Sequence, residues 1–327
     1  MMKNSVASFS GSEHFRLKYV ADSVVAAVAV SGTGSLGNAA IIDLGEITLV
    51  VDTFLTTQAA EDLKAAAEHL TGNPVSYVIN THWHSDHTSG NQVFVPTAQI
   101  ISTSATREVM NTFARDRLAH YRETAGQMMQ AIEEFETKIR QEADEKAKRE
   151  MAWENASDRE FMKMLPKLVH TLPTITFDQQ MTIHGSKRSV QLLTFGGGHT
   201  QSDTIVYLPE DKVVVTGDLV LSKHHPVLAY ANPEEWLHIL DKIELLGAEF
   251  IVPGHGEVCT LQELREVKGY ITDIMAIVED AVRNKKSIDE IEVPVAYRDW
   301  YFTTYFKGNL SKVQTIITAK EDKTILL

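Results

Sequence analysis

Three histidines and one aspartate lie within six residues of the segment 80–91, "NTHWHSDHTSGN". His82 and His84 are two positions apart, so both side chains can point to one side of an extended segment. Asp86 and His87 are adjacent and project in different directions, so one short loop can supply ligands to two neighbouring metal positions. Imidazole nitrogens and carboxylate oxygens are ligands for zinc, and catalytic zinc keeps a position open for water. The segment therefore predicts half of a metal site, with a polar surface loop as the alternative.

Three later segments place a metal-ligating residue after an apolar run. His199 follows three glycines and the run "SVQLLTF". Asp218 ends the run "KVVVTGD", and His255 lies between two glycines after "EFIVP". Strand ends that meet at one sheet edge commonly carry ligand sites on their loops. We therefore expect these three side chains to join the histidine segment at one point.

The order of apolar runs and turn residues predicts two mixed α/β halves that pack sheet to sheet. In the first half, two strand-like runs meet at Gly45 in a hairpin, and a helix over residues 56–72 precedes a strand over residues 75–80. In the second half, further strands are followed by a helix from Asn232 to near Gly247 and by a long helix from Leu261 to about Asn284.

The region between the two halves, at about residues 104–170, is rich in Glu, Lys, Arg, Ala and Met and is predicted to be a helical insertion. Ser157 and Glu160 have the spacing of a capping box, which predicts the start of a helix. An apolar stripe at helical spacing indicates a helix face that packs against another element. The stripe leaves open whether the insertion is a lid over a site or a dimer contact. The stripe consists of Met128, Ile132, Phe135 and Ile139.

The predicted domain organisation is one large domain over residues 1–285, which includes the insertion, and a C-terminal extension over residues 286–327. Aromatic residues are dense in the extension, with Trp300, Tyr301, Tyr305 and Phe306 within seven positions. We expect these residues to pack on the core or on a second subunit, so that a homodimer through the extension or the insertion stays open.

Composition limits the partners and the compartment. The 327 residues carry 31 Lys and Arg against 44 Asp and Glu, a formal charge of −13 that repels phosphate backbones, so we expect no nucleic-acid partner. The single cysteine, Cys259, excludes an intrachain disulfide. The N-terminal residues lack the apolar core of a secretory signal, and no apolar run is long enough for a membrane span. We therefore expect a soluble, cytoplasmic protein without a membrane partner.

The motifs "HWHSDH", "GGGHT", "TGD" and "PGHG", in this order, resemble those of the metallo-β-lactamase superfamily of hydrolases over about residues 24–282. The resemblance implies an α/β fold, a four-layer αββα sandwich, with two metal ions at the sheet edges. Zinc is the expected metal, with iron or manganese as alternatives. By the same resemblance, Asp218 would bridge both ions. The first ion would be held by His82, His84 and His199, and the second by Asp86, His87 and His255.

The resemblance also implies a reaction on a small-molecule substrate. A hydroxide shared by two metal ions would attack an ester, thioester, lactone or amide carbonyl, and Asp86 is the candidate for guiding protons. Asp218 occupies the position where the best-known zinc β-lactamases have cysteine or lack a bridge, which disfavours β-lactams as the main substrate. β-Lactam, phosphodiester and sulfate-ester hydrolysis remain alternatives within the superfamily. Two further alternatives are a mononuclear iron persulfide dioxygenase, which would use His82, His199 and Asp218, and a non-catalytic protein on the same fold.

Five further residues are candidates for supporting roles. Metal-bound imidazoles are oriented through their other ring nitrogen, and Asp52, Thr81 and Asp203 are placed to do this. His224 and His225 follow Asp218 by six and seven positions, in a loop that should open near the site, and are candidates for substrate contact.

Overall fold

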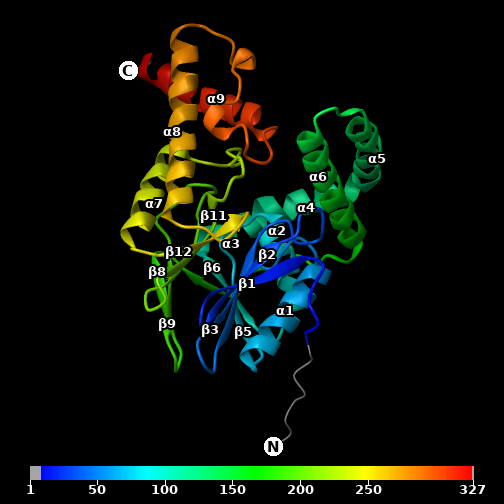
Figure 1. The fold of residues 1–327 in the computed structure, drawn as a ribbon, viewed down its shortest axis with the longest axis vertical. Helices are drawn as coiled ribbons and strands as arrows, with labels where there is room; N and C mark the ends of the chain where they lie inside the picture. The colour runs from blue at the N-terminus through cyan, green and yellow to red at the C-terminus, as the bar shows by residue number, and fades with distance from the viewer. Residues whose placement is uncertain (1–8, 326–327) are drawn as a thin grey trace, which may run out of the picture.

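Two β-sheets pack against each other and carry helices on both outer faces (Figure 1). The computed structural model describes residues 9–325. The first sheet has the strand order β1-β2-β3-β4-β5-β6-β7, antiparallel from β1 to β4 and parallel from β4 to β7. Its strands are β1 (Phe15–Ala21), β2 (Val24–Ala29), β3 (Ala39–Asp43), β4 (Thr48–Val51), β5 (Val75–Ile79), β6 (Gln99–Thr103) and β7 (Ile175–Phe177). The predicted hairpin at Gly45 is confirmed, because β3 and β4 pair antiparallel.

The second sheet has the order β12-β11-β10-β9-β8, with β11 and β12 parallel and the other pairs antiparallel. Its strands are β8 (Gln180–His184), β9 (Ser189–Leu193), β10 (Ile205–Leu208), β11 (Val213–Leu221) and β12 (Phe250–His255). All strands of the second sheet follow the insertion, and all strands of the first sheet except β7 precede it. The predicted αββα sandwich is confirmed.

Strand alternation divides the apolar residues between two cores. Successive side chains of a strand point to opposite faces of its sheet. In β3, Ala40 and Ile42 therefore pack between the sheets, with Val213 and Val215 of the second sheet. Ile41 of the same strand faces outward, into the core beneath the first outer helix. Both faces of the strand are buried, as a sandwich covered by helices requires.

The outer helices are amphipathic and bury one face each. Helix α1 (Thr57–Thr71) begins after Thr56, whose side chain accepts from the Ala59 amide, and ends at Gly72 in a left-handed conformation. On the second sheet lie α7 (Pro233–Leu245) and α8 (Leu261–Arg283), and α9 (Tyr305–Ile325) packs on α8. None of the helices within residues 9–325 is long and apolar enough to cross a membrane.

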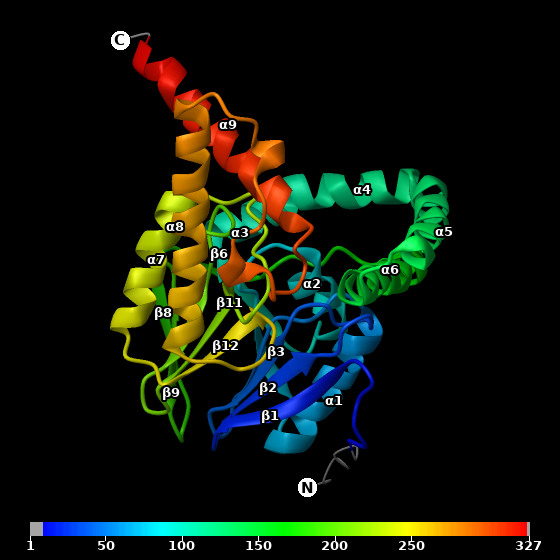
Figure 2. The ribbon, with the colours of Figure 1, turned by 45° about the horizontal axis from the view of Figure 1, so that its top comes forward.

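The insertion between β6 and β7 is helical, and it extends away from the sandwich (Figure 2). It comprises α3 (Ser104–Val109), the π-helical turn η2 (Met110–Ala114), α4 (Arg115–Glu123), α5 (Ala125–Gln141), α6 (Glu145–Met164) and the turn η3 (Leu165–Lys167). The helix start predicted at Ser157 is wrong. The Asp144 side chain caps α6 at the Ala147 amide, so Ser157 lies inside the helix and is buried. The Ser157–Glu160 spacing is therefore coincidental.

The C-terminal residues pack on the outer helices of the second sheet. Phe306 and Leu310 of α9 belong to the same apolar core as Tyr270 of α8. Trp300, which precedes α9, stacks on Tyr270 with ring centroids 5.5 Å apart. The remaining short helical turns are α2 (Ser85–Thr88), η1 (Ser89–Val93), η4 (Ile288–Glu290) and η5 (Val295–Tyr297).

Candidate metal centre

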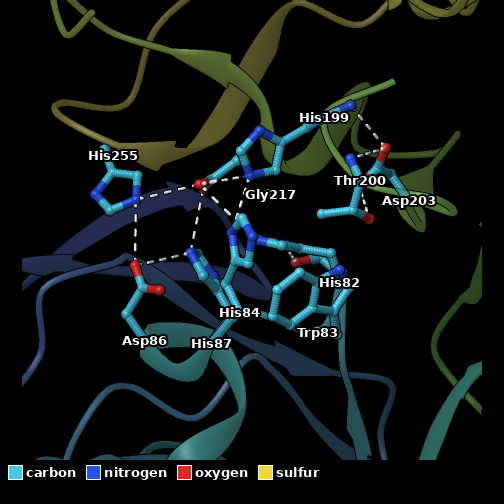
Figure 3. Close-up of polar contacts among 12 residues, drawn as sticks. His82, Trp83, His84, Asp86, His87, His199, Thr200, Asp203, Gly217 and His255 are labelled. Carbon is cyan, nitrogen blue, oxygen red and sulfur yellow. Dashed lines mark hydrogen bonds and ion pairs between the residues drawn. The ribbon is translucent and has the colours of Figure 1, made fainter. Parts of the chain in front are cut away.

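The predicted site residues come together where strands of both sheets end (Figure 3). The histidine segment follows β5, and Asp86 and His87 lie on the short helix α2 rather than in an extended loop. His199 lies in the connection between β9 and β10, and His255 is the last residue of β12. Two groups of ligand atoms result, and within each group all atoms lie within 4.8 Å of one another.

The first group contains His82, His84, His199 and Asp218. His84 Nδ1 lies 3.0 Å from His199 Nε2, which itself lies 3.3 Å from Asp218 Oδ2. His82 Nε2 lies 3.8 Å from the same oxygen. Three nitrogens and one oxygen therefore converge on one position.

The second group contains Asp86, His87 and His255. Asp86 Oδ2 lies 3.3 Å from His87 Nε2 and 3.3 Å from His255 Nε2. Asp218 faces this group as well, since its Oδ1 lies 3.1 Å from His87 Nε2 and its Oδ2 lies 3.4 Å from His255 Nε2. A single carboxylate thus stands between the two groups.

Two glycines allow Asp218 to occupy this place. Asp218 lies within β11, not at its end, and the pairing of β11 with β12 shifts register on both sides of Gly217. Gly217 has a φ of +51°, and a Cβ there would lie 2.5 Å from Thr81 Oγ1. A Cβ on Gly254 of β12 would lie 1.9 Å from Asp218 Oδ1. Only residues without a side chain allow this close approach.

The buried atoms of the site fit cation ligands. His82 Nε2, His87 Nε2 and Asp218 Oδ1 are buried and have no hydrogen-bond partner within the described part of the chain. Buried polar atoms are normally paired, so unpaired atoms that point at one position indicate a missing ligand. Imidazole nitrogen with carboxylate oxygen is a donor set that suits zinc and other first-row divalent metals. The residues present therefore fit a metal centre.

The carboxylates and imidazoles of the site shift one another's pKa values. Burial opposes ionisation of Asp86 and Asp218, but His87 and His255 outweigh it and hold both pKa values well below the usual range. Burial disfavours a charged His255, yet Asp218 and Asp86 raise its pKa to about 10. In His84, burial and His199 lower the pKa to about 3. The site thus offers anionic carboxylates beside imidazoles, and a cation would replace the protons that these rings carry.

Two of the three predicted supporting residues contact rings of the candidate ligands. Asp52 Oδ2 lies 2.8 Å from His87 Nδ1 and accepts from Thr81 Oγ1 at 2.7 Å. Thr81 Oγ1 lies 3.0 Å from His82 Nδ1. Asp52 has a φ of +61°, a conformation that aspartate tolerates better than most residues and that is concentrated at functional sites. Asp52 and Thr81 thus connect one ring of each ligand group.

Asp203 supports the site differently from the prediction. Its Oδ2 accepts from the backbone amides of Gly198 and His199, at 2.8 Å and 3.0 Å. It also accepts from Thr200 Oγ1 at 2.8 Å, so it fixes the loop that carries His199 and does not hold the imidazole. His199 Nδ1 has no hydrogen-bond partner among the described residues, and its ring packs against Trp236 with centroids 5.3 Å apart.

The two histidines proposed for substrate contact are placed differently. His224 lies beside the second ligand group, with its ring centroid 6.2 Å from that of His255. His225 is turned into the protein, where its Nδ1 lies 2.9 Å from Tyr270 Oη and its Nε2 lies 3.0 Å from the Tyr297 carbonyl oxygen. Its side chain is buried and both ring nitrogens are engaged, so His225 is a packing residue and not a substrate contact.

Two residues beside the ligands were not singled out from the sequence. Trp83 lies between two ligands in the chain, packs on His84 with ring centroids 4.4 Å apart and donates from Nε1 to Gln201. The alternation of side chains in an extended segment was the available signal for Trp83, because it places this residue on the side of the segment opposite to His82 and His84. Gly254 had no such signal, since its contact with Asp218 depends on how two strands pair.

Comparison with known proteins agrees with this geometry. The family model described as the metallo-β-lactamase superfamily matches residues 32–255. Solved structures of similar fold include a metallo-β-lactamase from Pontibacter korlensis, with a TM-score of 0.56 and 17% identity over 79% of this chain and 99% of that one. The metallo-β-lactamase DIM-1 has a TM-score of 0.54 and 17% identity, covering 80% of this chain and 98% of its own.

The curated relatives include two sulfatases. A linear primary-alkylsulfatase of Pseudomonas sp. is 24% identical over 255 residues, which is 73% of this chain and 45% of the relative. An alkyl/aryl-sulfatase of Saccharomyces cerevisiae is 22% identical over 84% of this chain and 45% of its own length. The chain therefore spans about half the length of these relatives. The protein belongs to the metallo-β-lactamase superfamily.

Proposed function

We propose that the protein holds two zinc ions and hydrolyses an ester, thioester, lactone or amide bond of a small molecule. The observation that carries this proposal is the position of Asp218, whose two oxygens lie 3.1–3.8 Å from nitrogens of both ligand groups. We assign one ion to His82, His84 and His199. The second ion is assigned to Asp86, His87 and His255, with Asp218 shared between them. When bound, such ions supply an activated water and polarise a carbonyl oxygen.

The chain's own residues have three further roles in this proposal. Asp86 directs Oδ2 toward His87 and His255, and we assign its other oxygen to guiding protons between the nucleophile and the leaving group. His224 donates from Nδ1 to the Ser222 carbonyl oxygen at 2.7 Å, which leaves Nε2 as an acceptor. Burial and the nearby His255 lower the pKa of His224 to about 4, so it is neutral near pH 7. We assign His224 to substrate contact as a neutral acceptor.

A sulfate ester is the second candidate for the bond that is cleaved. The relatives named as alkylsulfatase and alkyl/aryl-sulfatase align with 73% and 84% of this chain, which supports this candidate. Both relatives are more than twice as long as the aligned part, so the candidate depends on whether this chain alone completes a sulfate-ester site. The formal charge of −13 supports a small-molecule substrate over a nucleic acid.

A hydrolysis panel with metal quantification tests the proposal. Lactones, thioesters, β-lactams, phosphodiesters and alkyl sulfates would be assayed with the wild type and with the His84→Ala and Asp218→Ala variants. We expect turnover of at least one carbonyl ester class, about two metal ions per chain, and loss of turnover in both variants. His184→Ala, at an exposed position of β8, is the matched control and should keep full activity. A single iron with oxygen uptake would instead establish the persulfide dioxygenase, and metal without any hydrolysis would favour a non-catalytic protein.

A further inference from the structure

A cleft lies between the helical insertion and the histidine segment. Its volume is about 50 Å³, and its lining is mostly apolar, including Trp83, Met110, Leu118, Phe161 and Leu168. A single water needs roughly 10–15 Å³ of such volume, so the cleft has room for a short chain of a few carbon atoms and not for a polymer. Ser85 and Thr88 of α2 also line it, so the cleft is adjacent to the metal centre.

A π-helical turn places one helix face over Trp83. The segment η2, between α3 and α4, is π-helical and so has more residues per turn than an α-helix. Such turns are often found at functional sites. Phe113 of η2 packs on Trp83 with ring centroids 5.3 Å apart, and Arg117, one turn later, has its Cζ 5.9 Å from the Trp83 ring centroid. His170 Nε2 lies 2.8 Å from the Met110 carbonyl oxygen, which fixes this turn from the other side.

Arg117 is a guanidinium without an acidic partner in the cleft. Its Nε donates to Tyr121 Oη, and its Cζ lies 5.2 Å from the Tyr121 ring centroid. Within residues 9–325 no carboxylate forms an ion pair with it. Two nearby arginines do have partners, since Arg115 pairs with Asp116 and Arg122 donates to the Leu168 carbonyl oxygen. The terminal nitrogens of Arg117 are therefore available to a ligand.

Arg117 and the candidate ligand His84 both pack against the Trp83 ring. The Trp83 ring, which Arg117 covers, lies 4.4 Å from the His84 ring, so a single aromatic ring separates the guanidinium from a metal-ligand candidate. Tyr230 packs on Trp83 and on His84, and Phe113 packs on Tyr230. These aromatic side chains form a continuous apolar wall from the cleft to the ligand cluster.

We propose that Arg117 is a specificity-determining residue that binds an oxyanion at one end of the substrate, while the scissile bond of that substrate lies at the metal centre. The substrate class is a short aliphatic ester or thioester that carries a carboxylate or a sulfate at its far end. A guanidinium presents a planar pair of donors that matches such an oxyanion, and the lining of the cleft would contact the aliphatic part. The link to the scissile bond rests on the hydrolase function proposed above, whereas anion binding at Arg117 does not.

Equilibrium binding tests the anion site without requiring turnover. Hexanoate, hexyl sulfate and hexanol would be titrated into the metal-loaded wild type and into Arg117→Gln, Arg117→Lys and Arg115→Gln. We expect both anions to bind the wild type and to lose about ten- to hundred-fold in affinity in Arg117→Gln, as removal of a charge-assisted hydrogen bond implies. Arg117→Lys should keep part of the affinity, and Arg115→Gln on the same helix should keep all of it. A carboxylate bound only at the metal ions would have equal affinity in Arg117→Gln, and that result would overturn the proposal.

Turnover then tests the link to the metal centre. With 4-nitrophenyl esters, Arg117→Gln should raise KM about ten-fold or more for the hemisuccinate and leave kcat for the neutral butyrate ester unchanged. An equal loss for both esters, with unchanged melting temperature, would contradict a role in charge selection. If the anions bind through Arg117 but no ester is hydrolysed, the anion site stands and the proposed hydrolase function fails.

Discussion

Asp52→Asn is the substitution that most sharply tests how the ligand rings are held. Asp52 accepts from the Thr81 amide at 2.8 Å, from Thr81 Oγ1 at 2.7 Å and from His87 Nδ1 at 2.8 Å. Because the Thr81 hydroxyl donates its only proton to Asp52, its oxygen must accept from His82 Nδ1. Both rings therefore carry a proton on Nδ1, so Nε2 is the nitrogen that each ring would offer to a metal ion.

An asparagine cannot satisfy all three contacts. If its amide nitrogen replaces Oδ2, it donates toward Thr81 and His87, and the protons of His82 and His87 move to Nε2, where they block a metal ion. If the amide is flipped, the buried Thr81 amide loses its acceptor. Outer partners of metal-bound histidines are typically worth about 10–100-fold in metal affinity, or about 1–3 kcal/mol. We expect a loss of that size for both ions.

Chelator competition on the purified protein measures this loss, with circular dichroism to verify the fold. Asp241→Asn is the matched control, since that carboxylate is half-exposed on α7 and pairs with Lys268. Thr81→Val removes the contact to His82 and keeps that between Asp52 and His87, so it should weaken the first ion and spare the second. Wild-type affinity for both ions in Asp52→Asn would refute the reasoning.

Three further predictions follow from individual contacts. Gly254→Ala would place a Cβ 1.9 Å from Asp218 Oδ1 and 2.7 Å from the Asp218 backbone nitrogen, so we expect it to displace Asp218 and to leave less than one metal ion per chain. A wild-type metal content by mass spectrometry would contradict this. Because the pKa of His255 without a cation is about 10, the ring is protonated at pH 7 and must lose that proton to bind a metal. Calorimetry of zinc binding in buffers of different ionisation enthalpy should therefore show release of at least one proton, with apparent affinity rising with pH, and no release would count against the assigned ligand. Asn309 accepts from the buried Leu228 amide at 2.9 Å and donates to the Pro226 carbonyl oxygen at 2.7 Å. Asn309→Ala should cost about 1–3 kcal/mol of unfolding free energy in denaturant titrations, and a change under about 0.5 kcal/mol would show that water replaces the side chain.

Most of the candidate ligand positions were predictable, because they lie at or shortly after the end of a strand. The strands of the sandwich are short apolar runs whose alternation is visible in the sequence, and the sheet edge brings their ends together. His82 and His255 lie next to strand ends for this reason. Asp218 lies near the same edge but inside β11, because a register shift beside Gly217 lets the strand continue past the site. A local irregularity of this kind depends on the neighbouring strand and leaves no pattern in one sequence.

The supporting residues were less predictable, because their roles depend on tertiary contacts. Asp52 directly follows a strand and Asp203 lies just before one, and both are aspartates. Yet Asp52 contacts an imidazole, whereas Asp203 contacts backbone amides. His224 and His225 are adjacent, and packing by Tyr270 and the C-terminal residues turns only the second into the core. Arg117 lies in a helical region whose position over Trp83 could not be derived from periodicity.

Anomalous diffraction at the zinc edge from the purified, zinc-loaded protein would show whether Asp218 joins two cation sites. We predict two anomalous peaks about 3.5–4 Å apart, one among His82, His84 and His199 and the other among Asp86, His87 and His255, with Asp218 in contact with both. A single peak, or peaks away from these side chains, would contradict the account.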